Sequence, residues 1–195
     1  SAEWIPAWNI AYGMGVDGIS LPFILLAALL SVLCVAASWT AVQTRARHFY
    51  AALLVAETAM IGLFAASNLF VFFIFWELTA VSSVFLILRS GTKEAYKASM
   101  RYLGIQILSG VLLLMGTAFV FNEFQSLELR QMKLGDPGAI FIFIALGIKA
   151  AFPLMHNWLQ DSYPKATHTG AVVLSAFTTK LAVCALLRMF PGEDA

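Results

Sequence analysis

The feature that most constrains this chain is a series of apolar runs longer than a soluble core can bury. From Gly18 to Thr44 no residue is charged. A transmembrane helix needs about 20 mostly apolar residues, so this run predicts a span over 20–41. The composition agrees, because 61% of the residues are hydrophobic and only 12% are charged, against about 25% charged in a typical soluble protein. The chain is therefore predicted to be an integral membrane protein, which excludes a soluble domain, a disordered chain or a disulfide scaffold.

Five further spans follow from the same reasoning. The apolar stretch from His48 to Leu88 would be roughly 60 Å long as one helix, twice the ~30 Å hydrocarbon core. A turn at 65–68 is needed, which gives spans over 48–66 and 68–89. Later runs predict spans over 102–122, 138–159 and 168–190. No strand-like alternation occurs, so we expect an all-α, polytopic bundle of about six transmembrane helices in a single domain over 1–195.

The distribution of Lys and Arg predicts the orientation, because cytoplasmic loops of membrane proteins are enriched in these residues. The connectors after the first, third and fifth spans lie on one side and hold seven of them: Arg45, Arg47, Arg89, Lys93, Lys97, Arg101 and Lys165. The opposite side holds three: Arg130, Lys133 and Arg188. The first side is predicted to be cytoplasmic. Residues 1–17 then lie outside, where Trp4, Trp8 and Tyr12 suit an interfacial aromatic belt. No basic region precedes an apolar stretch at the start, so no signal peptide is expected.

Four ionisable residues lie near the centres of predicted spans: Glu57, Glu77, Lys149 and Lys180. A charge at the bilayer centre costs about 2.5–3.5 kcal/mol on insertion scales, so two acids and two bases at similar depth suggest pairing. One interpretation is a buried salt bridge that only fixes helix packing. The other is an ion or proton path, which is the default hypothesis for such residues. Glu57 could belong to such a path directly or could support one of the other three residues.

The fifth span contains a second unusual feature. Pro153 lies four residues after Lys149 and has no N–H to bond the lysine carbonyl, so the helix should kink or open there. Packing alone also explains some proline kinks. His156 lies two turns from Lys149 and is a candidate to extend a proton relay, or an interfacial histidine bonded to backbone. His168 begins the sixth span and fits a polar cap.

Other chemistry finds little support in the sequence. Cys34 and Cys184 lie in apolar runs and form no CxxC motif, and no His, Cys or carboxylate spacing matches a metal site. No nucleotide-binding motif, catalytic nucleophile or basic block for nucleic acid is present. Ser175, Thr178 and Thr179 are candidates for hydrogen bonds or water near Lys180, or for bonds to helix backbone. We expect no cofactor, no metal, no nucleic-acid partner and no catalytic chemistry of the chain's own.

Four segments, in this order, resemble a known family: GVDGISLPFILL (15–26), FVFFIFWELTAV (70–81), GIKAAFPLMHNWLQDSYPKA (147–166) and LSAFTTKLAVCALLR (174–188). They are similar to the antiporter-like subunits shared by respiratory complex I, multisubunit Mrp-type cation/proton antiporters and membrane-bound hydrogenases. The resemblance covers nearly the whole chain. The last segment is most similar to the Mrp D-type subunits. Family members are longer and contain two inverted five-helix repeats, of which this chain would hold one, over 48–190, and the preceding helix.

The resemblance implies a function as well as a fold. By motif match, Glu77 and Lys149 would form the family's mid-membrane charged pair, and Lys180 would continue the proton path. The chain would be a proton-translocating half-channel, of the Mrp Na⁺/H⁺ antiporter D type or, alternatively, of a complex I or hydrogenase subunit in an NADH:quinone oxidoreductase-type translocase. Its partners would be the lipid bilayer of a bacterial inner membrane, other membrane subunits, protons and Na⁺. A hypothesis from another class is a structural scaffold in the membrane.

Overall fold

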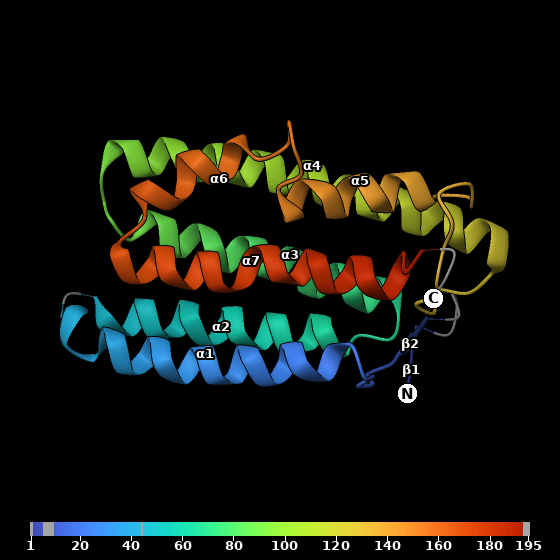
Figure 1. Cartoon of the computed structure of the whole chain (residues 1–195), viewed down its shortest axis with the longest axis horizontal. Helices are drawn as coiled ribbons and strands as arrows, with labels where there is room; N and C mark the ends of the chain where they lie inside the picture. The colour runs from blue at the N-terminus through green and yellow to red at the C-terminus, as the bar shows by residue number, and fades with distance from the viewer. Residues whose placement is uncertain (1, 6–9, 44, 193–195) are drawn as a thin grey trace.

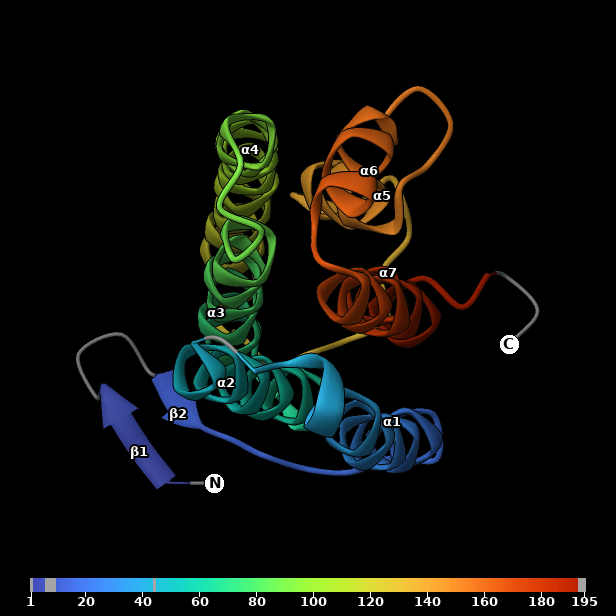
Figure 2. The same ribbon diagram turned by 90° about the vertical axis from the view of Figure 1, so that its left-hand side faces the viewer.

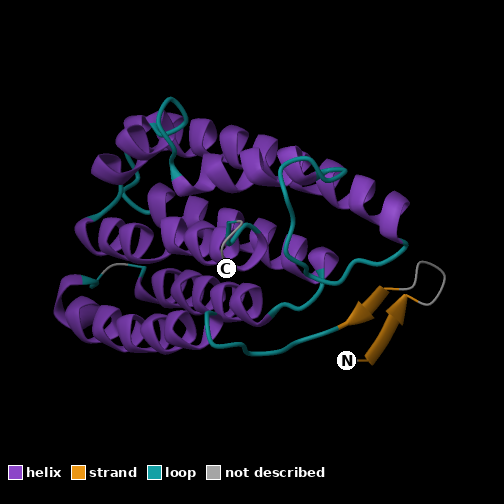
Figure 3. Cartoon of the chain, turned by 45° about the vertical axis from the view of Figure 1, so that its right-hand side comes forward, coloured by secondary structure: helices purple, strands orange, loops and turns teal. Residues whose placement is uncertain are grey.

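The computed structural model describes residues 2–5, 10–43 and 45–192, and these are predominantly helical (Figure 3). The helices are α1 (Ser20–Ala41), α2 (Ala46–Ala65), α3 (Leu69–Leu88), α4 (Lys93–Phe124), α5 (Ala139–Ala150), α6 (Asn157–Ser162), the 3₁₀ turn η2 (Tyr163–Lys165) and α7 (His168–Met189). Within these described residues, five helices (α1, α2, α3, α4 and α7) are long and apolar enough to cross a membrane. The expected all-α membrane bundle is confirmed.

The expected fifth span, over 138–159, is not one helix. It consists of the short helices α5 and α6, separated by a turn near Pro153, so the predicted break is confirmed. α4 also differs from the expected span over 102–122, because it begins at Lys93. The Thr92 hydroxyl caps its first turn by accepting from the Ala95 N–H at 3.0 Å. The helix therefore extends through a cationic segment that hydropathy alone assigns to a connector.

The helices form a closed ring in which α1, α2, α3 and α4 alternate in direction, α5 and α6 run the same way one after the other, and α7 runs back (Figures 1 and 2). α1 packs on α2, α2 on α3, α3 on α4, and α4 on α5, while α7 closes the ring against α5 and α1. The α1–α2, α3–α4 and α6–α7 connections gather at one end of the bundle, and the hairpin β1–β2 and the end of α7 lie at the other (Figure 1). The connectors that carry the seven cationic residues, predicted to be cytoplasmic, thus share one end.

Glycines allow α4 and α5 to approach closely. A Cβ on Gly116 would lie 2.8 Å from the carbonyl oxygen of Gly138, where a side chain could not fit. Gly138 precedes α5 with a φ of 81°, a conformation that favours glycine. The Ser109 hydroxyl donates to the Ala145 carbonyl at 2.9 Å across the same interface. Small residues and interhelical hydrogen bonds are typical of helix packing in membranes, where the lipid provides no hydrophobic driving force.

A short hairpin precedes the bundle. Strands β1 (Ala2–Ile5) and β2 (Ile10–Tyr12) pair antiparallel, an element that the sequence did not predict. Trp4 packs edge-on against Tyr12, with ring centroids 6.1 Å apart, and against Phe70 of α3 at 6.0 Å. Two of the three aromatic residues expected at the interface thus cluster together, and Trp8 lies outside the described residues.

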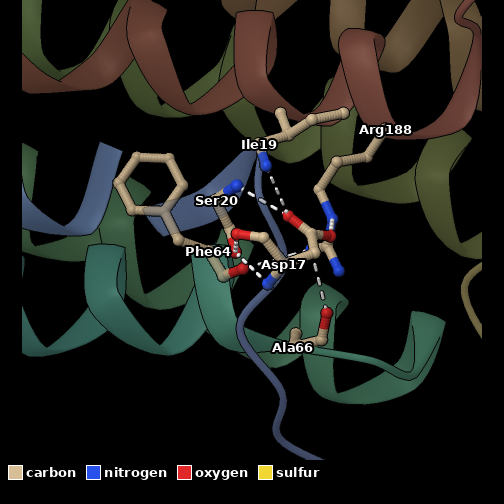
Figure 4. A network of polar contacts seen from close by, with 6 residues as sticks. All are labelled: Asp17, Ile19, Ser20, Phe64, Ala66 and Arg188. Carbon is tan, nitrogen blue, oxygen red and sulfur yellow. Dashed lines mark hydrogen bonds and ion pairs between the residues drawn. The ribbon is translucent and has the colours of Figure 1, made fainter. Parts of the chain in front are cut away.

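Arg188, near the end of α7, ties three segments together at the end opposite the cationic connectors (Figure 4). Its guanidinium pairs with the Asp17 carboxylate at 2.9 Å and donates to the carbonyls of Phe64 and Ala66 at 3.1 and 3.0 Å. Partial burial opposes ionisation of Asp17, but hydrogen bonds from Ser20 and the charge of Arg188 outweigh it and lower the pKa of Asp17. This cluster fixes the start of α1 and the end of α2 against α7.

Candidate functional site

Glu77 lies midway along α3 and is half-buried. The helix begins at Leu69 because the Asn68 side chain accepts from the Phe70 N–H at 2.8 Å. The carboxylate points toward α4, where the absence of a side chain at Gly110 leaves it room, since a Cβ there would overlap Oε1. Oε1 is buried and accepts no hydrogen bond from the described residues. A buried carboxylate oxygen without a hydrogen-bond partner is costly.

Lys149 lies in the last turn of α5 and is only 1% exposed. Its ammonium donates to the Trp76 carbonyl at 3.0 Å and to the Thr79 hydroxyl at 2.8 Å. It also lies 3.9 Å from the centroid of the Trp76 ring, a cation–π contact. Lys149 therefore crosses from the broken helix to the same turn of α3 that carries Glu77.

Glu77 and Lys149 lie close enough to interact electrostatically, and their role as a pair in a proton path stays a prediction. They form no direct ion pair, because the lysine bonds instead to Trp76 and Thr79, on either side of Glu77 in the chain. The charges are thus held near each other with the carboxylate oxygen left open to a further partner.

The break beside Lys149 is built by the backbone rather than by Pro153 alone. α5 ends in a Schellman motif: the Phe152 N–H donates to the Gly147 carbonyl at 3.0 Å, and the Ala151 N–H donates to the Ile148 carbonyl at 3.2 Å. Ala151 adopts a left-handed conformation with φ 60°, two residues before the proline. The Trp158 indole N–H then donates to the Ile148 carbonyl at 2.9 Å. The helix is thus already terminated where proline was expected to open it.

Polar groups continue from Lys149 toward the end of the bundle where α6 meets α7. Thr79 lines a cavity of about 10 Å³ together with Ser82, Ser83 and Thr178, about the volume that one water needs. Beyond it, the Tyr163 hydroxyl lies 2.5 Å from the Thr178 hydroxyl. On the other side of Glu77, α4 buries Gln106, and neither amide atom has a partner among the described residues.

These polar residues include several that the sequence did not single out. Thr178 was a candidate near Lys180, but it bonds Tyr163 and the Leu174 carbonyl instead. Thr79 and Gln106 carry a sequence signal, because each recurs at helical spacing with serines in an apolar span: Ser82 and Ser83 on α3, and Ser109 on α4. Tyr163 carries none, because it follows a short helix outside the apolar runs.

The other candidate residues lie apart from this cluster. Lys180 is half-buried and donates to the Ser175 carbonyl at 2.6 Å. It faces α1, where it lines a small cavity with Phe23 and Leu30, so it is not joined to Lys149 by the contacts of the described residues. Glu57 is half-buried in α2, and His156 is half-buried before α6. Neither side chain has a hydrogen bond within the described part of the chain.

His168 is exposed at the first position of α7, which Thr167 caps by accepting from the Gly170 N–H at 3.2 Å. No group of three or more His, Cys, Asp or Glu side chains that could hold a metal comes together in the described ranges. The chemistry available at this site is therefore that of one carboxylate, one buried amine and several hydroxyls, all able to accept or pass protons.

The fold and this site define an integral membrane protein with a broken helix beside a buried lysine. Residues 66–192 match the family model described as "NADH:quinone oxidoreductase/Mrp antiporter, TM", and residues 2–62 match "NADH-ubiquinone oxidoreductase chain 4, amino terminus". The chain therefore belongs to the NADH:quinone oxidoreductase/Mrp antiporter membrane family, as the sequence motifs indicated.

Curated relatives and solved structures give the same result. NAD(P)H-quinone oxidoreductase chain 4-2 of Synechocystis sp. is 32% identical over 99% of this chain and 36% of its own length. A chain of respiratory complex I from Thermus thermophilus superposes with a TM-score of 0.80 and 25% identity, covering 92% of this chain and 42% of the other. A chain of the Mrp complex from Dietzia sp. superposes with a TM-score of 0.77 and 25% sequence identity. This match covers 90% of the present chain and 35% of the other. The chain spans a little over a third of the length of the curated relatives it matches.

Proposed function

We propose that this chain is a proton-conducting unit of an antiporter-like membrane subunit, with Glu77 and Lys149 as its central charged pair. One observation carries the proposal: the amine of Lys149 is fully buried at the end of a broken helix and bonds the turn of α3 that holds Glu77. Burial favours the neutral form of a lysine, and a nearby carboxylate favours the charged form. A lysine between these opposed effects can gain and lose a proton when its surroundings change.

The polar groups around the pair suggest how protons reach it. The Thr79 hydroxyl, the small cavity beside it and the Thr178–Tyr163 contact extend from Lys149 toward the predicted cytoplasmic end. In our proposal a water in this cavity connects Lys149 to that end. Lys180 would pass the proton onward, and Glu57 and His156 would have supporting roles. Since Lys180 faces α1 rather than Lys149, its step requires water or a change in side-chain conformation.

The experiment that tests this proposal measures proton translocation and assembly separately, in the whole protein within its membrane complex. Lys149→Met and Glu77→Gln should each abolish coupled proton movement while the complex still assembles. Lys180→Ala should do the same, and Lys180→Arg should also fail, because a guanidinium stays protonated at any accessible pH. Normal pumping by the arginine variant would reduce Lys180 to a fixed positive charge.

A structural scaffold is the competing function. In that case the buried charges would only fix how α3 and α5 pack, and replacing Glu77 with Leu and Lys149 with Met would leave transport intact. The orphaned Oε1 of Glu77 argues against this role, because a carboxylate kept for packing should be hydrogen-bonded. Transport by the double variant at the wild-type rate would favour the scaffold.

For the parent complex we propose a chain 4-type subunit of a quinone-reducing assembly in a bacterial inner membrane. The matched amino-terminal model and the cyanobacterial relative support this choice. The Mrp D-type antiporter, with Na⁺ as coupled ion and favoured by the motif at 174–188, remains the second candidate, and the likeness to a chain of the Mrp complex supports it. Sodium-dependent proton movement in vesicles containing the purified complex would favour the Mrp type, and quinone-dependent movement the other.

A further inference from the structure

A large groove lies on the outer side of the bundle between α2 and α3, away from the buried charges. Its volume is about 680 Å³, within the ~300–1,000 Å³ of typical ligand sites. The walls are apolar and include Phe49, Val55, Val81 and Phe85. Phe85 is 60% exposed, so the described chain leaves the groove open to whatever surrounds the bundle.

One end of the groove is cationic. Arg45, His48 and Arg89 line it there, and the described residues that line the groove include no acid. Arg89 lies with its guanidinium carbon 4.9 Å from the centroid of the Phe49 ring, which holds the charge at the mouth. α2 also begins at this end, with neither an acidic residue in its first turn nor a side-chain cap. The positive end of its helix dipole therefore adds to the attraction for an anion.

The length and orientation of the groove fit one leaflet of a bilayer. From Arg45 to Val55, α2 rises roughly 15 Å, which is half of the ~30 Å hydrocarbon core. The cationic mouth lies at the end of the bundle that carries the predicted cytoplasmic connectors (Figure 1). Basic pockets between transmembrane helices at a cytoplasmic surface are suited to anionic lipid headgroups.

We propose that this groove binds an anionic phospholipid, with its phosphate at Arg45, His48 and Arg89 and one acyl chain between α2 and α3. The apolar walls alone would accept any lipid chain. The two arginines select the headgroup, because an arginine binds phosphate oxygens with paired, charge-assisted hydrogen bonds. A bound lipid of this kind would brace α2 against α3, the helix that carries Glu77.

The test uses the whole protein in its membrane assembly, exchanged into micelles with equal amounts of dioleoyl phosphatidylglycerol and dioleoyl phosphatidylcholine. Native mass spectrometry then gives the ratio of the two lipids retained. Arg45→Gln should lower the preference for phosphatidylglycerol about fivefold, the effect expected for one cation at a membrane surface. Arg47→Gln is the matched control, since Arg47 is the exposed arginine two residues away and does not line the groove. The control should retain the wild-type ratio.

A second variant tests the apolar part of the site with the cations intact. Ala51 is exposed and lines the groove, so Ala51→Trp should exclude the acyl chain and release both lipids from this site without disturbing the core. Inorganic phosphate should not displace the lipid if the chain contributes to binding. Equal loss with Arg45→Gln and Arg47→Gln, or lipid retention unchanged by Ala51→Trp, would overturn the proposal. So would a cross-link from Phe85→Cys to another protein segment in native membranes, which would make the occupant a protein.

Discussion

Gly110 on α4 offers a test of whether the position of Glu77 matters, without altering any ionisable group. A Cβ at position 110 would overlap Oε1 of Glu77 and lie 2.8 Å from its carboxyl carbon, where ordinary contacts are 3.4–4 Å. Gly110→Ala must therefore displace the carboxylate by at least about half an ångström. A misplacement of about 1 Å can cost a positioned reacting group a factor of about 100 in rate. We expect proton translocation to fall by roughly tenfold or more.

Stability should change little in the same variant. Alanine gains about 1 kcal/mol over glycine within a helix, and forcing Glu77 off its preferred rotamer costs about 0.5–1.5 kcal/mol. These two effects nearly cancel, so the complex should assemble and its Tm should stay near the wild-type value. Loss of transport would then report the displaced carboxylate and not an unfolded protein.

Gly104→Ala is the matched control, because a Cβ at this position on the same helix meets nothing within 4 Å. This variant has the same gain in helix propensity but no overlap with the Glu77 side chain, so transport should be unchanged. The assay is proton uptake into vesicles containing the purified complex, followed with a pH-sensitive dye. Equal transport by the Gly110 and Gly104 variants would refute the view that Glu77 works only at its present position.

Three further predictions concern the elements that hold the site. Asp17→Asn should remove a pH-dependent stabilisation: because the native pKa of Asp17 is lowered, its contribution is present above its unfolded pKa of about 3.9 and is lost as pH falls below that. Thermal melts across this range should show a smaller decline for the variant, and an unchanged decline would contradict the role of the Arg188 pair. Ala151→Gly should stabilise the protein by about 0.5–1 kcal/mol. The left-handed conformation costs alanine roughly 1–2 kcal/mol, and removing this strain is partly offset because glycine loses more conformational entropy on folding, roughly 0.5–1 kcal/mol. A lowered Tm would argue against the Schellman termination. Trp158→Phe should destabilise it by about 0.5–1.5 kcal/mol, because the Ile148 carbonyl loses the indole donor but keeps the bond from the Ala151 N–H; a denaturation curve matching the wild type would show that the indole bond contributes nothing.

The membrane class, and the positions of Glu77 and Lys149 within apolar helices, could be predicted from the sequence for simple physical reasons. Mostly apolar runs of about 20 residues indicate membrane helices, and the depth of Glu77 and Lys149 follows from counting along such runs. Pro153 indicated a broken helix beside the lysine, and the structure has the break. Hydrophobic length, residue depth and the effect of proline could be predicted because each depends only on one segment and the solvent around it.

What a side chain faces could not be predicted in this way. Lys180 looked equivalent to Lys149 by depth, yet it turns toward α1 and bonds Ser175. The direction of a residue around its helix depends on which neighbours the helix packs against, and residue depth carries no such information. The contacts of Lys149 with Trp76 and Thr79 depend on where α4 and α7 hold α5 relative to α3, and the spacing along the chain does not contain that information.

The sequence by itself therefore determined that this is a multi-span membrane protein with acids and bases at mid-depth, because hydrophobic length and charge cost are properties of individual segments. Only the tertiary structure decided which charges meet, that α5 ends at a left-handed Ala151 before the proline, and that Arg188 closes on Asp17 from the other end of the chain. It also formed the groove between α2 and α3. These features depend on contacts between residues far apart in sequence, and such contacts exist only once the helices have packed.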